Sequence, residues 1–165
     1  RGGEEIEDLM EEGIPFQVVP AVTAASGCAT YSGIPLTHRD YSQACMFVTG
    51  HLKDGSTNLN WAAMAQPNQT VVFYMGLQAV EVIGNELINH GMPGDTPAAL
   101  IEKGTTPDQK VYIGTLDTLP DLVHRYDVKA PTLIIVGNVV RLHGRLNWYN
   151  AEEHEAGSDD VQETA

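Results

Sequence analysis

The stretch Thr132–Val136 (TLIIV) decides the fold class of this chain. It is a continuous apolar run without alternation, which is typical of a strand in a sheet that is covered on both faces. Outward from this stretch, further apolar segments predict the strands that would share its sheet: 44–49, 70–74, 97–101 and 110–113. Helices must cover such a sheet, so the pattern predicts an α/β layer fold.

Two helical patterns lie between these predicted strands. The first begins after Gly76 and extends over about 13 residues. Its apolar stripe consists of Val80, Ile83, Leu87 and Ile88. The second covers 119–126 and tolerates Pro120 in its first turn. Strands that alternate with helices in this way again favour an α/β protein.

The first residues of the chain predict a helix, a strand and a second helix. Residues 4–12 have an amphipathic helical pattern that Gly13 ends. Residues 16–19 (FQVV) predict a short buried strand. Thr23 is expected to cap a helix of small residues over 24–29, and such residues indicate that a ligand or another element approaches the helix closely.

The composition excludes several classes of function. The formal net charge is −13, which makes a nucleic-acid partner improbable because phosphates need a basic face. No apolar run approaches the roughly 18 residues that a membrane span requires. Cys28 and Cys45 form no C-x-x-C pair, so we interpret them as reduced packing residues with no metal or redox role.

One region reverses the acidic character of the chain. Between residues 13 and 53 the only acidic residue is Asp40. Four basic side chains lie in the same region: His38, Arg39, His51 and Lys53. This local excess of basic groups indicates an anionic ligand.

Several stretches, in this order and spacing, resemble the tetrapyrrole methylase family. They are RGGEE (1–5), GIPF (13–16), VPAVTAASG (19–27), YSGIPLTHRD (31–40), VTGH (48–51), FYMGL (73–77) and LIIVG (133–137). The resemblance extends from Arg1 to about Trp148. Within the family, SGIPLTHRDY and VTGHLK point to the enzymes that act on uroporphyrinogen.

The resemblance implies a fold and an activity. Residues 1–35 would be the end of an N-terminal α/β domain with a hinge, 36–150 a complete C-terminal α/β domain with a mixed sheet, and 151–165 a disordered acidic tail. The implied reaction is the S-adenosylmethionine-dependent C-methylation of uroporphyrinogen III to precorrin-2, for sirohaem or cobalamin, with S-adenosylhomocysteine as product. The resemblance also implies a homodimer, and the reduced cysteines predict a cytoplasmic location.

The resemblance further implies which residues bind each ligand. Thr23, Ala24, Met75 and Gly104 would contact the cofactor, and Thr132 would offer backbone groups near the adenine. Since uroporphyrinogen carries eight carboxylates, His38 and Arg39 would bind the substrate. The family's proton-transfer residues are expected upstream of Arg1, so no catalytic residue is assigned.

Taken without the family resemblance, several of these residues allow other interpretations. His38 and Arg39 fit an ordinary exposed loop pair as well as a substrate contact, and Met75 alone would more often be a core residue. Ala21 stands where the family pattern has glycine. At the level of function, the alternatives are another corrin-pathway methylase of the same fold and an inactive binding or dimerisation fragment.

Overall fold

The computed structural model describes residues 2–50 and 59–149. His51, Lys53 and the predicted acidic tail at 151–165 lie outside these residues. In the described part, no helix has both the length and the apolar character that crossing a membrane requires. The division of the chain at residue 35 stays a prediction.

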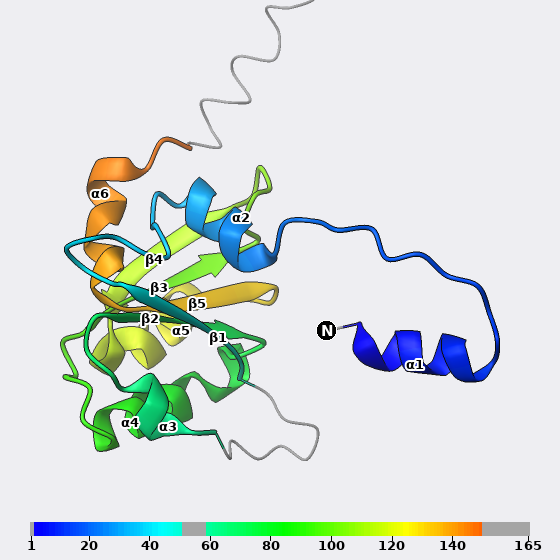
Figure 1. The fold of residues 1–165 in the computed structure, drawn as a ribbon. Coiled ribbons are helices and arrows are strands. Elements are labelled where there is room, and N and C mark those ends of the chain that lie inside the picture. Colours follow the sequence, from blue (N-terminus) through cyan, green and yellow to red (C-terminus); the bar gives the residue numbers. More distant parts are fainter. Residues whose placement is uncertain (1, 51–58, 150–165) are drawn as a thin grey trace, which may run out of the picture.

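A five-stranded mixed sheet forms the centre of the molecule, in the order β1-β2-β5-β3-β4 (Figure 1). The strands are β1 (Ala44–Thr49), β2 (Gln69–Tyr74), β3 (Pro97–Glu102), β4 (Lys110–Thr115) and β5 (Thr132–Val136). β1 and β2 are parallel, whereas all other neighbouring strands are antiparallel. The predicted α/β fold with a mixed sheet is therefore confirmed, and TLIIV is its buried middle strand.

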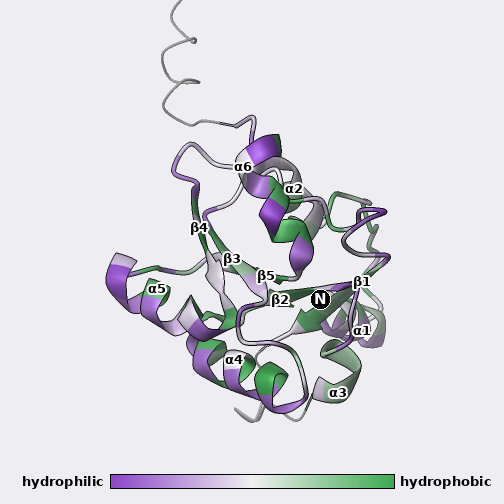
Figure 2. Ribbon diagram, turned by 90° about the vertical axis from the view of Figure 1, so that its left-hand side faces the viewer, coloured by the Kyte–Doolittle hydropathy of each residue, from purple (hydrophilic) through white to green (hydrophobic). Residues whose placement is uncertain are grey.

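Helices cover the sheet on both faces, as the apolar run of β5 requires (Figure 1). One face packs against α3 (Trp61–Met64), α4 (Val80–Asn89) and α5 (Leu119–Tyr126). The other face packs against α2 (Ala24–Tyr31) and the 3-10 helix η3 (Asn138–Leu142), which is followed by α6 (His143–Leu146). Figure 2 shows strands that are largely green and helices α4 and α5 that are striped green and purple, as expected for elements with one buried face.

Alternation along the strands sorts the side chains between these two layers. In β2, Val71 and Phe73 belong to the apolar cluster beneath α4, whereas Val72 and Tyr74 lie on the side of α2. Of the predicted stripe of α4, Ile83 and Leu87 are fully buried. The predicted helix after Gly76 is confirmed as a short 3-10 turn, η1 (Leu77–Ala79), that continues into α4.

The prediction of a buried strand at 16–19 is wrong. These residues form no strand, and Val19 is 81% exposed. A strand exists only where a neighbour accepts and donates its backbone hydrogen bonds, and no described strand lies beside this segment. The preceding helix α1 (Gly3–Glu11) is confirmed and ends near Gly13, which has a φ of 64°, but none of its residues is buried.

Candidate ligand-binding site

A cavity of about 920 Å³ lies at one end of the sheet. Its wall is built from α2, the carboxyl ends of β2 and β3, and the amino end of β5. Its apolar lining includes Ala24, Cys28, Ile101, Val128, Pro131 and Leu133. Charged groups from Lys103, Asp108 and Lys129 also line it. A large, mostly apolar hollow with a few polar groups is the usual form of a small-molecule site.

The cavity brings together residues that are far apart in the sequence. Ala24, Met75 and Gly104, all predicted cofactor contacts, line it, and so does Thr132. The fourth predicted contact, Thr23, does not line the cavity, but its hydroxyl is hydrogen-bonded to the hydroxyl of Tyr74, which does.

Tyr74 fixes the start of α2, and pattern analysis missed this role. The Ala25 amide donates a hydrogen bond of 3.0 Å to Tyr74 Oη. Thr23 is the N-cap residue of α2, as predicted, and has the extended backbone of that position, but its side chain makes no capping hydrogen bond. The hydroxyl of Tyr74 replaces it because Tyr74 lies on the strand face that α2 covers. Tyr74 lies two residues after Val72, so strand alternation places both on the same face of the sheet, and this spacing could have predicted the contact with α2.

Met75 adopts an unusual backbone conformation at the end of β2. Its φ is 53°, in the left-handed region, and its side chain is 47% exposed on the cavity. The next residue, Gly76, has no room for a side chain, because a β-carbon there would lie 2.9 Å from Ile83 Cδ1. A left-handed non-glycine residue costs about 1–2 kcal/mol, so the surrounding packing must hold Met75 in place.

The turn around Gly104 packs directly on α2. A β-carbon on Gly104 would overlap Cys28 Sγ, and one on Gly27 would lie 3.2 Å from Thr105 Cγ2. The small residues of α2 predicted that a ligand or another element approaches this helix closely. The turn is such an element, because larger side chains at Gly27 or Gly104 would meet the other segment.

Gln109 ties the turn to α2. It accepts a hydrogen bond from the Thr105 amide (2.7 Å) and donates one to the Tyr31 carbonyl (3.0 Å). The Thr105 amide is therefore not free to bind a ligand. The Gly104 amide, in contrast, donates no hydrogen bond within the part of the chain that the structure describes.

His38 and Arg39 lie away from the cavity. They belong to the loop before β1, whereas the cavity lies beyond the carboxyl end of the parallel neighbour β2, at the opposite end of the sheet (Figure 1). The His38 amide donates to the Ser42 carbonyl (2.8 Å), and the ring nitrogen Nδ1 accepts from the Asp40 amide (3.2 Å). Arg39 is exposed and forms no ion pair with any residue that the structure describes.

The two cysteines are free thiols. Burial raises the pKa of the Cys28 thiol, so it stays protonated at neutral pH in the cavity wall. Burial also raises the pKa of Cys45, which lies outside the cavity. Neither thiol therefore has the depressed pKa of a nucleophilic cysteine.

Comparison with known proteins gives consistent relatives. The family of Tetrapyrrole (Corrin/Porphyrin) Methylases matches residues 1–120. The siroheme synthase of Thioalkalivibrio sulfidiphilus is 65% identical over 149 residues, which cover 90% of this chain and 30% of the relative. The chain thus spans about a third of the length of the curated relatives that it matches.

Solved structures agree in fold. Uroporphyrin-III C-methyl transferase from Thermus thermophilus, complexed with S-adenyl homocysteine, has a TM-score of 0.72 and 33% identity, over 86% of this chain and 61% of that one. A cobalt precorrin-4 methyltransferase has a TM-score of 0.74 over 84% of this chain and 59% of that one. At 23% identity, the second likeness shows the fold alone.

Proposed function

Because the chain belongs to the tetrapyrrole (corrin/porphyrin) methylase family, we propose that it forms the cofactor-binding part of a methyltransferase. The cofactor is S-adenosylmethionine and the substrate is uroporphyrinogen III, which is methylated to precorrin-2 in the cytoplasm by a homodimer. One observation carries the proposal: Ala24, Met75 and Gly104, which come from three separate segments, line a single cavity. The siroheme synthases among the relatives favour the sirohaem branch.

The residues of the cavity suit S-adenosylmethionine chemically. The apolar surface of Ile101, Val128 and Leu133 can pack on an adenine ring, and the thioether of Met75 can pack beside a sulfonium. The Gly104 amide, without a partner in the described residues, can donate to a polar group of the ligand. When bound, S-adenosylmethionine supplies an electrophilic methyl group.

The contribution of this chain to the reaction is positioning. Tyr74 holds the start of α2 against the end of β2, so that Ala24 and Met75 keep a fixed separation across the cavity. The buried Cys28 thiol and the apolar wall exclude water from the same side. Fixing the reactants in one geometry can supply a large share of a rate enhancement, on the order of 7–11 kcal/mol in favourable cases.

His38 and Arg39 are proposed to bind carboxylates of the macrocycle. The loop that carries them is anchored, because the Gln43 amide donates to the Asn68 carbonyl (3.0 Å) and Thr70 Oγ1 donates to Ser42 Oγ (2.9 Å). A ligand that touched both Met75 and this loop would have to extend along β1, roughly 17 Å. Such a ligand must be large, as a tetrapyrrole with its carboxylate side chains is.

The test is a chimera in which this chain replaces the matching third of the Thioalkalivibrio sulfidiphilus siroheme synthase. We expect the chimera to bind S-adenosylhomocysteine with a micromolar dissociation constant in calorimetry and to convert uroporphyrinogen III to a doubly methylated product. Met75→Ala should weaken binding about tenfold, the loss expected for one well-packed contact of about 1.4 kcal/mol. Arg141→Ala, a surface change outside the cavity, is the control.

The substrate contact is tested separately. Arg39→Ala should raise the KM for uroporphyrinogen III and leave the Kd for S-adenosylhomocysteine unchanged. An unchanged KM would refute the role of Arg39 while leaving the cofactor site intact. A chimera that binds no S-adenosylhomocysteine, although the parent enzyme does, would refute the proposed function itself.

A further inference from the structure

Glu102 is a buried carboxylate directly behind the cavity. It is 8% exposed and ends β3 between Ile101 and Lys103, both of which line the cavity. Because neighbouring residues of a strand face opposite sides, Glu102 itself points away from the cavity, toward Tyr112 on the α5 side of the sheet. Burying a carboxylate is costly unless it accepts hydrogen bonds, so its partners carry structural information.

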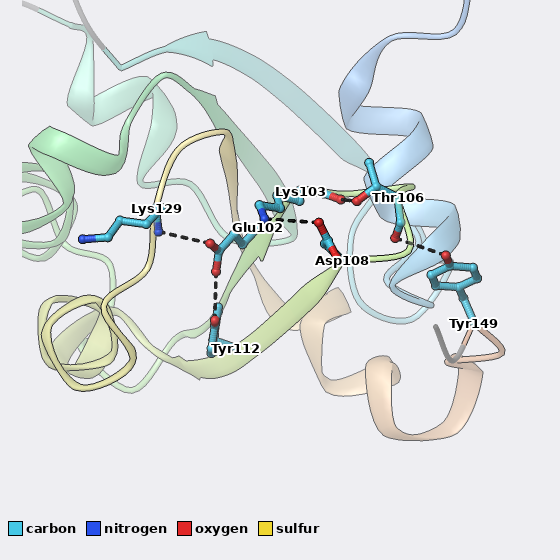
Figure 3. A network of polar contacts seen from close by, with 7 residues as sticks. All are labelled: Glu102, Lys103, Thr106, Asp108, Tyr112, Lys129 and Tyr149. Atoms are coloured by element: carbon cyan, nitrogen blue, oxygen red, sulfur yellow. Dashed lines mark hydrogen bonds and ion pairs between the residues drawn. The ribbon is translucent and has the colours of Figure 1, made fainter. Parts of the chain in front are cut away.

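Among the described residues, each oxygen of Glu102 has one hydrogen-bond partner (Figure 3). The Tyr112 hydroxyl donates to Oε2 at 2.9 Å, and the backbone amide of Lys129 donates to Oε1 at 3.4 Å. Tyr112 is fixed in turn by its neighbour Tyr126, with ring centroids 5.1 Å apart. The carboxylate therefore connects β4 to the segment that follows α5.

That segment, residues 128–132, forms one wall of the cavity, and all five of its residues line it. Residues 129–131 are exposed and belong to no helix or strand. Within the described part of the chain, two hydrogen bonds join them to β3 and its following turn: Lys129 N donates to Glu102 Oε1, and the Lys103 amide donates to the Pro131 carbonyl at 2.9 Å. Glu102 supplies the only side-chain contact of these two.

We propose that Glu102 is a positioning residue of the ligand site, whose carboxylate holds segment 128–132 in place as the cavity wall. The inference rests on the proposed function for the identity of the ligand. Glu102 does not touch that ligand. Its removal loosens the wall, which weakens ligand binding, but it leaves the bound, reacting geometry close to that of the wild type.

Variants at position 102 distinguish the effect of the hydrogen bonds of Glu102 from the effect of its negative charge. Glu102→Gln keeps both links, because its oxygen can accept from Lys129 N and its amide group can donate to Tyr112 Oη. Glu102→Ala removes both links. Should Glu102→Ala fail to fold, Glu102→Asp replaces it, because the shorter side chain cannot reach both partners. Glu86→Ala on α4, a half-buried glutamate paired with His90, is the matched control.

In the chimera, we expect Glu102→Ala to raise the KM for S-adenosylmethionine and the Kd for S-adenosylhomocysteine about tenfold, with kcat within about twofold of wild type. For Glu102→Gln and Glu86→Ala, the KM, the Kd and kcat should all stay within about twofold of the wild-type values. A loss in Glu102→Gln equal to that in Glu102→Ala, or a folded Glu102→Ala with an unchanged KM, would overturn the proposal.

A second readout needs no ligand. In the 165-residue chain, amide hydrogen exchange at Lys129 should accelerate in Glu102→Ala and not in Glu102→Gln, whereas exchange at Val128, whose amide donates to Val123, should not change. Unchanged exchange at Lys129 would refute the positioning contact. If the chimera with wild-type Glu102 neither binds nor methylates, the proposed function fails, and the exchange pattern still decides whether Glu102 holds the wall.

Discussion

Gly104 and Cys28 touch so closely that a β-carbon at position 104 would overlap the sulfur of Cys28. Gly104 is therefore needed for packing between its turn and α2, quite apart from any ligand. This contact makes the two positions interdependent and predicts non-additive mutations.

Gly104→Ala should lower the free energy of unfolding by about 1–3 kcal/mol, the usual cost of overpacking. Cys28→Ala removes the sulfur, so in that background Gly104→Ala should cost less than half as much. Urea unfolding of the wild type, both single variants and the double variant measures this coupling. Additive costs would show that the turn can move away from the sulfur.

Tyr74→Phe should loosen the start of α2. The change removes the acceptor of the Ala25 amide and the partner of the Thr23 hydroxyl, at a cost of about 1 kcal/mol. Amide exchange at Ala25 should accelerate. Tyr126→Phe is the control, because the Tyr126 hydroxyl has no hydrogen bond within the described residues. Equal effects of the two changes would argue against the anchoring role.

Met75→Gly should separate stability from binding. Glycine adopts the φ of 53° without strain, so the free energy of unfolding should hold or rise by about 1 kcal/mol. The loss of the side chain from the cavity should nevertheless weaken S-adenosylhomocysteine binding about tenfold. Asn68→Gly, at a φ of 54° outside the cavity, should leave binding unchanged. Thermal unfolding and calorimetry on the same chimeras give both quantities.

Tyr112 should give the chain a pH-dependent stability in the alkaline range. Burial, together with the hydrogen bond to Glu102, raises the pKa of Tyr112 to about 12 from an ordinary value of 10.0. Since the neutral phenol is favoured in the folded state, its contribution to stability is complete below pH 10 and is lost as the pH rises toward 12. Tyrosinate absorbance, taken as the difference between wild type and Tyr112→Phe, measures this pKa, and Glu102→Gln should lower it.

Segments with strong periodicity could be predicted from the sequence. The bounds of α5 and β5 agree with the prediction because an amphipathic stripe and an apolar run each specify one local structure. The strand at 16–19 could not be predicted in this way, since a strand also needs a neighbour, which local pattern does not supply. β3 continues one residue beyond its predicted end, because the backbone of Glu102 pairs with Lys110 of β4 and with Thr132 of β5.

The site was only partly visible in the sequence. Met75 and Gly104 were found through resemblance to a family, since a lone methionine and a turn glycine carry no distinctive pattern. Tyr74 and Glu102 were missed because each acts on a segment more than 25 residues away, on α2 and on Lys129. Such pairs depend on which strands become neighbours, and spacing along the chain does not specify that.

The central position of β5 also determines when the sheet can be completed during synthesis of the chain. Of the five described strands, β5 leaves the ribosome last, yet it lies in the middle of the sheet. Until then the β1–β2 pair and the β3–β4 hairpin remain separate, and each exposes an unpaired edge on its inner side. A nascent chain that stalls before Thr132 would therefore keep the inner edges of β2 and β3 unpaired, and unpaired strand edges favour aggregation.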